Sequence, residues 1–264
     1  HSAEHYGIDE AFFTMWGDNG AECPLFAVLP SVVSAAETVY GHGGDEQWLY
    51  ARFEKIAGLA WKDFILLDLP DVLEDDPCDL CNPSKYLLYN DCLMGILDCT
   101  VRETDEEKYA EYAARLQTFA KHKKWGYMFA SAASLCRVLA IKANLGNRTH
   151  EAYDANDKIA LSEITENEYS ELLHRVRKFH TLFRTAWLTE NKPQGFEVQD
   201  ARLGGLYGRI ESCRITLREY LGGKTNSVAE LDEPRIDLSG KKEFSHKHIR
   251  LNKWSENYTG GMSD

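Results

Sequence analysis

Long stretches of helical periodicity in the second half of the chain constrain its fold more than any other feature. Beyond Thr104, apolar residues such as Tyr109, Ala113 and Leu116 recur every three or four positions, which places them on one face of a helix. Three further patterns of this kind cover residues 128–146, 165–191 and 198–222. Long helices joined by short links pack as a bundle, antiparallel where the links are shortest. The sequence therefore predicts a mostly α-helical, bundle-like domain.

Residues 1–44 follow a different order. The apolar run of residues 11–16 lies between Gly7 and a Gly-Asp-Asn-Gly turn, which is typical of a buried strand. Residues 25–40 then have helical spacing, and the glycines of residues 41–44 end that helix. A lone strand cannot close a sheet, so its partner strands must lie outside this chain or in a neighbouring copy.

The rest of the chain divides at two further points. Residues 46–57 predict a helix, and residues 61–95 are rich in turns and predict packed, irregular structure. After Pro234 the chain is polar, and we expect a partly ordered tail. The expected domains are residues 1–44, a helical domain over 45–240 and a polar tail over 241–264.

Composition argues against some classes of partner. The 264 residues are 44% apolar and 27% charged, as in ordinary globular proteins, and the formal net charge is −12. Nucleic acids and anionic membranes attract clustered Lys and Arg, so this charge favours a neutral or cationic ligand. No run approaches the ~20 apolar residues that span a bilayer, and residues 1–5 lack a signal-peptide pattern. We expect no nucleic-acid or membrane partner and a cytoplasmic location.

The cysteines suggest a reducing compartment. There are seven, an odd number, and they are spread over helical patterns and loops, which suits buried thiols better than a disulfide framework. Cys78 and Cys81 have the spacing of half a zinc site, but Cys92 and Cys99 lie too far apart to form the usual second pair. We therefore expect no metal and no other cofactor, and keep a zinc-bound helical domain as the weakest alternative.

The string His42-Gly43-Gly44-Asp45-Glu46 ends in adjacent Asp and Glu residues, as do the strings that carry the acid pair of several sugar hydrolases. Such a pair lies at the carboxyl end of a barrel strand. Here the preceding residues end a helix, so Asp45 and Glu46 more plausibly begin the next one, where acids favour the helix dipole. We therefore assign no catalytic residue to this string.

A second candidate site follows the predicted strand. Trp16 offers an indole face that can pack on the C–H face of a pyranose, and Asp18 offers a carboxylate that can accept hydrogen bonds from sugar hydroxyls. An aromatic residue and an acid at the carboxyl end of a strand suit a sugar site. The alternative is a core Trp at a sheet edge followed by turn residues.

Three glycines interrupt the last helical pattern. Gly204, Gly205 and Gly208 each cost up to ~1 kcal/mol relative to Ala inside a helix. We expect the close approach of a neighbouring helix to offset this cost, and the alternative is a kink.

Several strings together resemble glycoside hydrolase family 20, the β-N-acetylhexosaminidases. Residues 7–22, with Thr-Met-Trp-Gly-Asp-Asn-Gly-Ala-Glu, and the helix that follows look like the last strand and helix of the family's (β/α)8 barrel. The remaining strings are similar to the helical carboxy-terminal domain of bacterial members; they cover residues 64–70, 82–91, 220–223 and 230–234. The resemblance thus spans nearly the whole chain.

The resemblance implies a retaining exo-hydrolase that removes terminal N-acetylglucosamine or N-acetylgalactosamine with help from the substrate's own acetamido group. It implies that Trp16 is the floor under the terminal sugar and that Asp18, where some members have Glu, accepts its outer hydroxyls. The family's catalytic Asp-Glu pair, on the fourth barrel strand, has no counterpart here. Residues 1–44 would then be a remnant of the barrel, and the chain alone would be inactive.

A different class of function also fits the residues. The apolar run of residues 11–16 and the helix faces that a barrel would cover could instead build an interface. In that interpretation the chain is a helical interaction module that forms a homodimer, with no catalytic role.

Overall fold

The computed structural model describes residues 5–15, 24–41, 45–73 and 82–235. Within these ranges the chain is mostly helical and contains no strand, which confirms the expected helical domain but not the expected barrel remnant. The early elements are η2 (Leu25–Val28), α2 (Leu29–Tyr40), α3 (Glu46–Ala57), α4 (Trp61–Phe64), η3 (Ile65–Asp71), α5 (Pro83–Tyr89) and η4 (Asp98–Thr100). The later elements are α6 (Asp105–Gln117), α7 (Gly126–Lys142), α8 (Leu145–Asp154), α9 (Lys158–Glu163), η5 (Ile164–Glu168, a π-helical turn), α10 (Tyr169–Glu190), α11 (Phe196–Leu221) and α12 (Ala229–Asp232).

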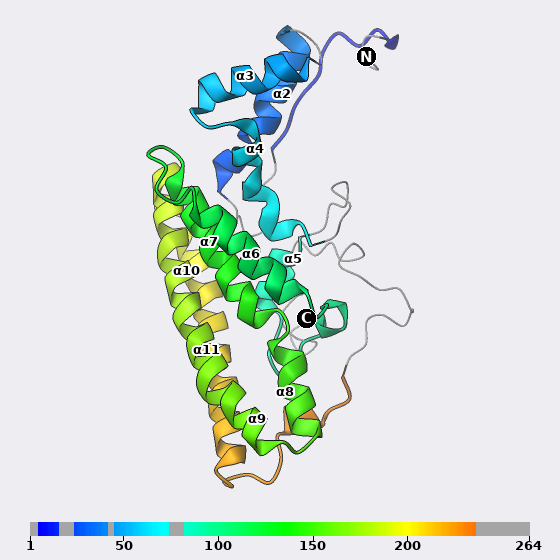
Figure 1. Ribbon diagram of the computed structural model, residues 1–264, viewed down its shortest axis with the longest axis vertical. Coiled ribbons are helices and arrows are strands. Elements are labelled where there is room, and N and C mark those ends of the chain that lie inside the picture. Colours follow the sequence, from blue (N-terminus) through cyan, green and yellow to red (C-terminus); the bar gives the residue numbers. More distant parts are fainter. Residues whose placement is uncertain (1–4, 16–23, 42–44, 74–81, 236–264) are drawn as a thin grey trace.

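The long helices form the predicted bundle. Helix α7 packs against both α6 and α10, and α10 packs against α11 along its length (Figure 1). Helices α2 and α3 form a separate pair at one end of the elongated molecule, and α8 and α9 lie toward the other end (Figure 1). The helices expected beyond Thr104, over 165–191 and over 198–222 are therefore confirmed as α6, α10 and α11, with bounds that differ by a few residues.

Helix α7 is the centre of the core. Most of its residues are buried, including Phe129, Cys136 and Leu139, which have no exposed surface. The run Gly126–Asp154 is long and apolar enough to cross a membrane, with a mean hydropathy of 1.3 over its best window, although we expected no such run. Because 72% of that window is buried inside the fold, core packing explains its apolar character.

Gly146 does not end a helix, as its position after a helical pattern suggested. Helix α7 ends at Lys142, and the chain continues at once into α8, which contains Gly146. A Cβ added at Gly146 would lie 2.7 Å from Oδ2 of Asp98. The glycine is required because a buried carboxylate lies against the helix, and not because the helix stops there.

The expected buried strand over residues 11–16 is not found in its described part. Residues 8–15 form neither helix nor strand, and Phe12 is 89% exposed. A strand needs neighbouring strands for its backbone hydrogen bonds, and the described residues supply none. The barrel remnant expected at residues 1–44 therefore stays a prediction, as do the boundaries after residues 44 and 240.

The glycines of α11 do not face a neighbouring helix, which corrects a further expectation. A Cβ added at Gly204, Gly205 or Gly208 would meet no atom of the described residues within 4 Å. All three positions are exposed, while the opposite face of α11, with Leu206 and Ile210, is buried. Close packing of a neighbouring helix among the described residues therefore does not offset their helix-propensity cost.

Candidate functional site

The two predicted sugar-binding residues, Trp16 and Asp18, lie outside the described residues, as do Cys78 and Cys81. The structure does describe both flanks of the Trp16 segment, namely residues 8–15 and the chain from Pro24 onward. Within the described residues (5–15, 24–41, 45–73 and 82–235), no three His, Cys, Asp or Glu side chains form a group that could hold a metal ion.

Asp45 and Glu46 have structural roles. Asp45 is the N-cap of α3, and its carboxylate accepts hydrogen bonds from the amides of Gln47 (3.0 Å) and Trp48 (3.1 Å). Glu46 occupies the first turn, near the positive end of the helix dipole, where it accepts a hydrogen bond from the Tyr50 hydroxyl (3.4 Å). The expectation that these acids begin a helix is confirmed.

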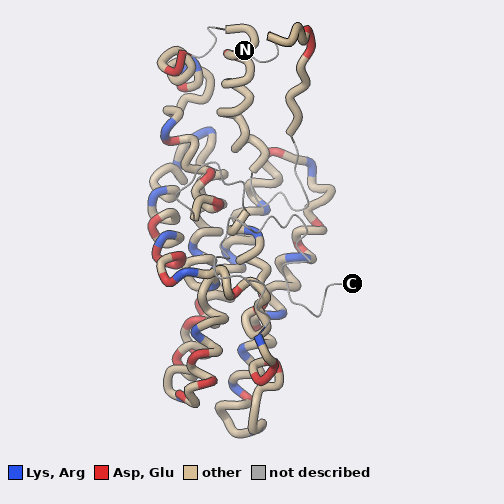
Figure 2. The backbone as a smooth tube through the Cα atoms, turned by 90° about the vertical axis from the view of Figure 1, so that its right-hand side faces the viewer, with Lys and Arg blue, Asp and Glu red and all other residues tan. Residues whose placement is uncertain are grey.

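Residues 8–15 and 25–40 expose many large apolar side chains. Phe12 and Tyr40 are 89% and 90% exposed. The others in this part of the chain are Ile8, Phe13, Met15, Leu25, Phe26, Val32 and Val39. Helix α2 carries a single charged residue, Glu37, whereas charges of both signs lie along the helices of the lower part of the molecule (Figure 2). Exposed apolar side chains gathered in one part of a chain are typical of surfaces that a partner or another domain covers. We call the exposed apolar residues of 8–15 and 25–40 the apolar face.

The start of η2 is tied to the bundle by Glu190, the last residue of α10. The Leu25 amide donates to Oε2 of Glu190 (2.6 Å), and the Tyr127 hydroxyl, at the start of α7, donates to Oε1 (2.9 Å). Burial raises the pKa of Glu190, while the Tyr127 hydroxyl and the amides of Leu25 and Phe26 act to lower it. These contacts fix the place at which the chain enters η2 and α2.

Helix α2 is in turn tied to α3. The Trp48 indole N–H donates to Oε2 of Glu37 (3.1 Å), and Arg52 forms an ion pair with the same carboxylate (3.4 Å). The two helices of the apolar end are therefore held together by one acid as well as by packing.

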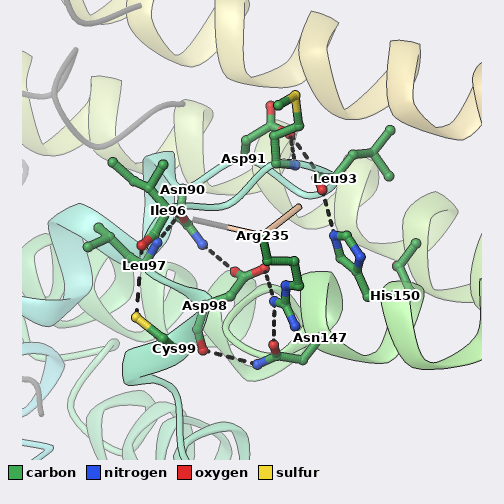
Figure 3. Close-up of polar contacts among 12 residues, drawn as sticks. Asn90, Asp91, Leu93, Ile96, Leu97, Asp98, Cys99, Asn147, His150 and Arg235 are labelled. Atoms are coloured by element: carbon green, nitrogen blue, oxygen red, sulfur yellow. Dashed lines mark hydrogen bonds and ion pairs between the residues drawn. The ribbon is translucent and has the colours of Figure 1, made fainter. Parts of the chain in front are cut away.

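A buried polar cluster lies at the other side of the bundle, centred on Asp98. Its carboxylate accepts from the Asn90 amide (2.6 Å) and the Arg235 guanidinium (2.7 Å), and Arg235 also donates to Asn147 (2.6 Å). Figure 3 shows Arg235 reaching this carboxylate beside Asn147. Burial raises the pKa of Asp98 despite the opposing effect of Arg235 and Asn90. The cluster joins the residues after α12 to the loop between α5 and α6.

A second buried acid, Asp91, anchors α11 to the same loop. Arg209 donates to both oxygens of Asp91 (2.5 and 3.0 Å) and also pairs with Glu230. The amides of Leu93 (2.8 Å) and Met94 (2.9 Å) donate to Asp91 as well. The Asp91 carboxylate therefore makes four hydrogen bonds and leaves no room for a ligand.

Two cavities among the described residues are too small or too open for an enclosed sugar site. The cavity beside His150 and Arg235 has a volume of about 20 Å³, close to that of one water molecule. A wider groove of about 270 Å³ runs between α10 and α11, where Arg177 lies over the Tyr207 ring (4.6 Å) and Glu211 and Arg214 pair with each other (3.6 Å). These side chains already contact one another.

Comparison with protein families decides where the chain belongs. Residues 62–250 match the family described as the glycoside hydrolase 20C C-terminal domain. The chain belongs to this family. No curated protein matches the chain in a sequence search.

The match confirms, over residues 62–250, the resemblance of the helical domain to glycoside hydrolase family 20. The strings at residues 64–70, 82–91, 220–223 and 230–234 all lie within the matched range. The structure explains two of them, because Asp91 and Glu230 are the partners of Arg209. Residues 1–61, with Trp16 and Asp18, lie before the match.

Sequence reasoning missed the residues that fix this geometry. Asp91, Asp98 and Arg235 were not singled out, because their partners lie 118 and 137 residues away along the chain. Glu190 was also missed, although its position at the end of a predicted helix could have identified it. A negative charge at the carboxyl end of a helix opposes the helix dipole and indicates a partner elsewhere in the fold.

Proposed function

We propose that this chain is the carboxy-terminal part of an exo-acting β-N-acetylhexosaminidase, which hydrolyses terminal N-acetylglucosamine or N-acetylgalactosamine by substrate-assisted, retaining catalysis. The family match over residues 62–250 is the observation that carries the proposal, because it assigns the helical domain to glycoside hydrolase family 20. The catalytic Asp-Glu pair would lie on a barrel upstream of this chain, so the chain itself supplies no catalytic residue.

Two residues of the chain would bind the substrate. The Trp16 indole would form the floor under the terminal amino sugar, and the Asp18 carboxylate would accept hydrogen bonds from its outer hydroxyls. Neither role needs a metal or an organic cofactor. The partner is then an amino-sugar glycan, and a cytoplasmic location fits the odd number of cysteines.

The apolar face supports the same proposal. Phe12, Phe13 and Val39 are exposed, and large apolar side chains gathered in one part of a protein are typical of surfaces that another part of the protein covers. The remaining strands and helices of a barrel would cover it, and would supply the strand partners that residues 8–15 lack among the described residues.

Kinetics of the barrel-containing polypeptide test the substrate-binding role. We expect Trp16→Ala to lower kcat/KM on a chromogenic N-acetylglucosaminide about tenfold, which corresponds to ~1.4 kcal/mol of lost stacking. Trp16→Phe keeps an aromatic face and serves as the matched control, with a loss of about threefold or less. A Trp16→Ala enzyme with the kinetics of the unmodified one would contradict the assignment.

A homodimer built on the helical domain is the second candidate. It is favoured by the apolar face and by the exposed glycines of α11, which would let a second backbone approach closely. Sedimentation equilibrium of the purified chain tests the second candidate. A dimer that dissociates when Phe12 and Phe13 are changed to Ser favours the interaction module, and a monomer at high concentration counts against it.

A further inference from the structure

We propose that the exposed face of α11 pairs with the same face of a second copy of this chain, with the two helices antiparallel about a two-fold axis. The inference concerns the helical domain alone, so it depends neither on the proposed activity nor on a barrel. Helix α11 lies at the side of the bundle, with α10 as its main helical neighbour (Figure 1). Its face away from the core is therefore in a position to meet a partner.

This face of α11 has the spacing of a coiled-coil seam. Its residues recur at alternating intervals of three and four, and each of them is exposed: Val198, Ala201, Gly205, Gly208, Ser212 and Ile215. We call these six residues the α11 seam. Leu203, Leu206 and Ile210, on the other side of the helix, are buried in the core. A heptad repeat keeps one row of residues facing a partner along the whole contact, as two paired helices require.

The α11 seam is uncharged and is smallest at its centre. None of its six residues is charged, although 27% of the chain is. Gly205 and Gly208 lie in the middle, where glycine lowers the stability of an isolated helix relative to alanine. Without Cβ atoms the backbones of two helices can approach closely, and that contact would offset the cost. The Ser212 hydroxyl donates to the carbonyl of Gly208 (3.0 Å), so a partner can cover it without breaking its hydrogen bond.

The order of residues in the seam suits pairing with itself. From either end it begins with a branched apolar residue, continues with a small one and reaches a glycine at the centre. In an antiparallel pair centred between the two glycines, Val198 of each copy packs on Ile215 of the other. Gly205 of one copy then lies opposite Gly208 of the other. Large residues therefore close both ends of the contact, and the centre allows close approach.

The charges beside the seam favour the antiparallel orientation. Glu197 is exposed next to Val198, and Arg218 lies three positions after Ile215 with 44% of its side chain exposed. Antiparallel pairing sets Glu197 of each copy beside Arg218 of the other, whereas parallel pairing brings like charges together at each end. The guanidinium binds Glu166 of its own chain through Nε and Nη2, so Nη1 can donate to a second carboxylate.

The seam by itself makes a small interface. It is shorter than the about 20–30 residues a side of a standard interface, so we expect a dimer that dissociates on dilution, with a Kd on the order of 10 µM. Thermal unfolding of the dilute chain then reports on the monomer and not on this interface.

Sedimentation equilibrium over about 1–200 µM tests the interface. Each protein in the series carries Phe12→Ser and Phe13→Ser, so that the apolar face does not contribute. Gly208→Leu puts a large side chain in the middle of the seam, where a Cβ meets none of the described residues within 4 Å, so the monomer is expected to stay folded. We expect this change to weaken the dimer by about tenfold or more. Ala110→Leu, at an exposed position of α6, is the matched control and is expected to leave the Kd unchanged.

Charge exchange in the same series tests the orientation. Glu197→Arg and Arg218→Glu are each expected to weaken the dimer about threefold, and the chain with both changes is expected to recover to within about twofold. A double variant that binds no more tightly than the single variants would overturn the antiparallel register. A chain that stays monomeric at about 200 µM, or a dimer that Gly208→Leu leaves intact, would overturn the interface.

Discussion

Replacing Asp91 with alanine is expected to lower the free energy of unfolding by about 3–4 kcal/mol. The Asp91 side chain is fully buried and holds Arg209 through two hydrogen bonds, so its loss leaves a cation that is only a quarter exposed without its main partner. The amides of Leu93 and Met94 lose their acceptor at the same time. Urea unfolding at pH 7 measures the loss.

Glu111→Ala is the matched control for this prediction. Glu111 pairs with Arg115 four residues later on the exposed surface of α6, and such pairs contribute only about 0.3–0.5 kcal/mol. If both variants unfold at the same urea concentration, the ion pair of Asp91 is not what secures α11 to the loop after α5.

The effect of Asp91 is expected to depend on pH. Burial acts to raise its pKa, but the hydrogen bonds and charge of Arg209, with two backbone amides, hold the pKa below the usual value. The unfolded chain therefore takes up this proton at a higher pH than the folded chain does. The stabilisation is complete above the unfolded pKa of ~3.9 and is lost as the pH falls through the folded pKa. We expect Asp91→Ala and unmodified protein to differ by a constant amount from about pH 5 to 7 and by less below about pH 4.

Replacing Gly146 with alanine is expected to destabilise the domain by about 2–3 kcal/mol. The new Cβ would lie 2.7 Å from Oδ2 and 3.0 Å from Oδ1 of Asp98, a carboxylate held in place by Asn90 and Arg235. The side chain cannot retreat without breaking one of those hydrogen bonds. Thermal unfolding is expected to show a lower Tm.

Gly208→Ala is the matched control and has the opposite expected sign. It lies within α11, where a Cβ would meet none of the described residues within 4 Å, so alanine's helix propensity should raise stability by about 0.5–1 kcal/mol. A higher Tm for Gly146→Ala would contradict the close approach of Asp98. A lower Tm for Gly208→Ala would indicate that a partner covers α11, as the homodimer alternative requires.

Local patterns were enough to predict most of the helices. Apolar spacing and stop signals placed α2, α3, α10 and α11 within a few residues, because each helix buries one face and ends at Gly or Asn. The role of Asp45 followed from the same reasoning, since a cap needs only its own helix.

Features that depend on distant residues were not predictable in this way. Gly146 has the appearance of a helix stop, and only the position of Asp98 explains it. The strand expected at residues 11–16 would need partners that the described residues do not include. The cap at Leu25 comes from Glu190, which no local pattern connects to it. The sugar-binding role of Trp16 and Asp18 was predicted from the pairing of an aromatic residue with an acid and from the family resemblance. Their placement stays a prediction.

The location of the catalytic acids is tested by comparing the turnover of a chromogenic N-acetylglucosaminide by the purified 264-residue chain with turnover by the barrel-containing polypeptide. We expect turnover by the longer polypeptide and none above background by the chain, because the acids that transfer the proton would lie upstream of the chain. Turnover by the chain alone that survives Trp16→Ala and is abolished by Glu46→Gln would contradict it, since the acid would then lie on α3.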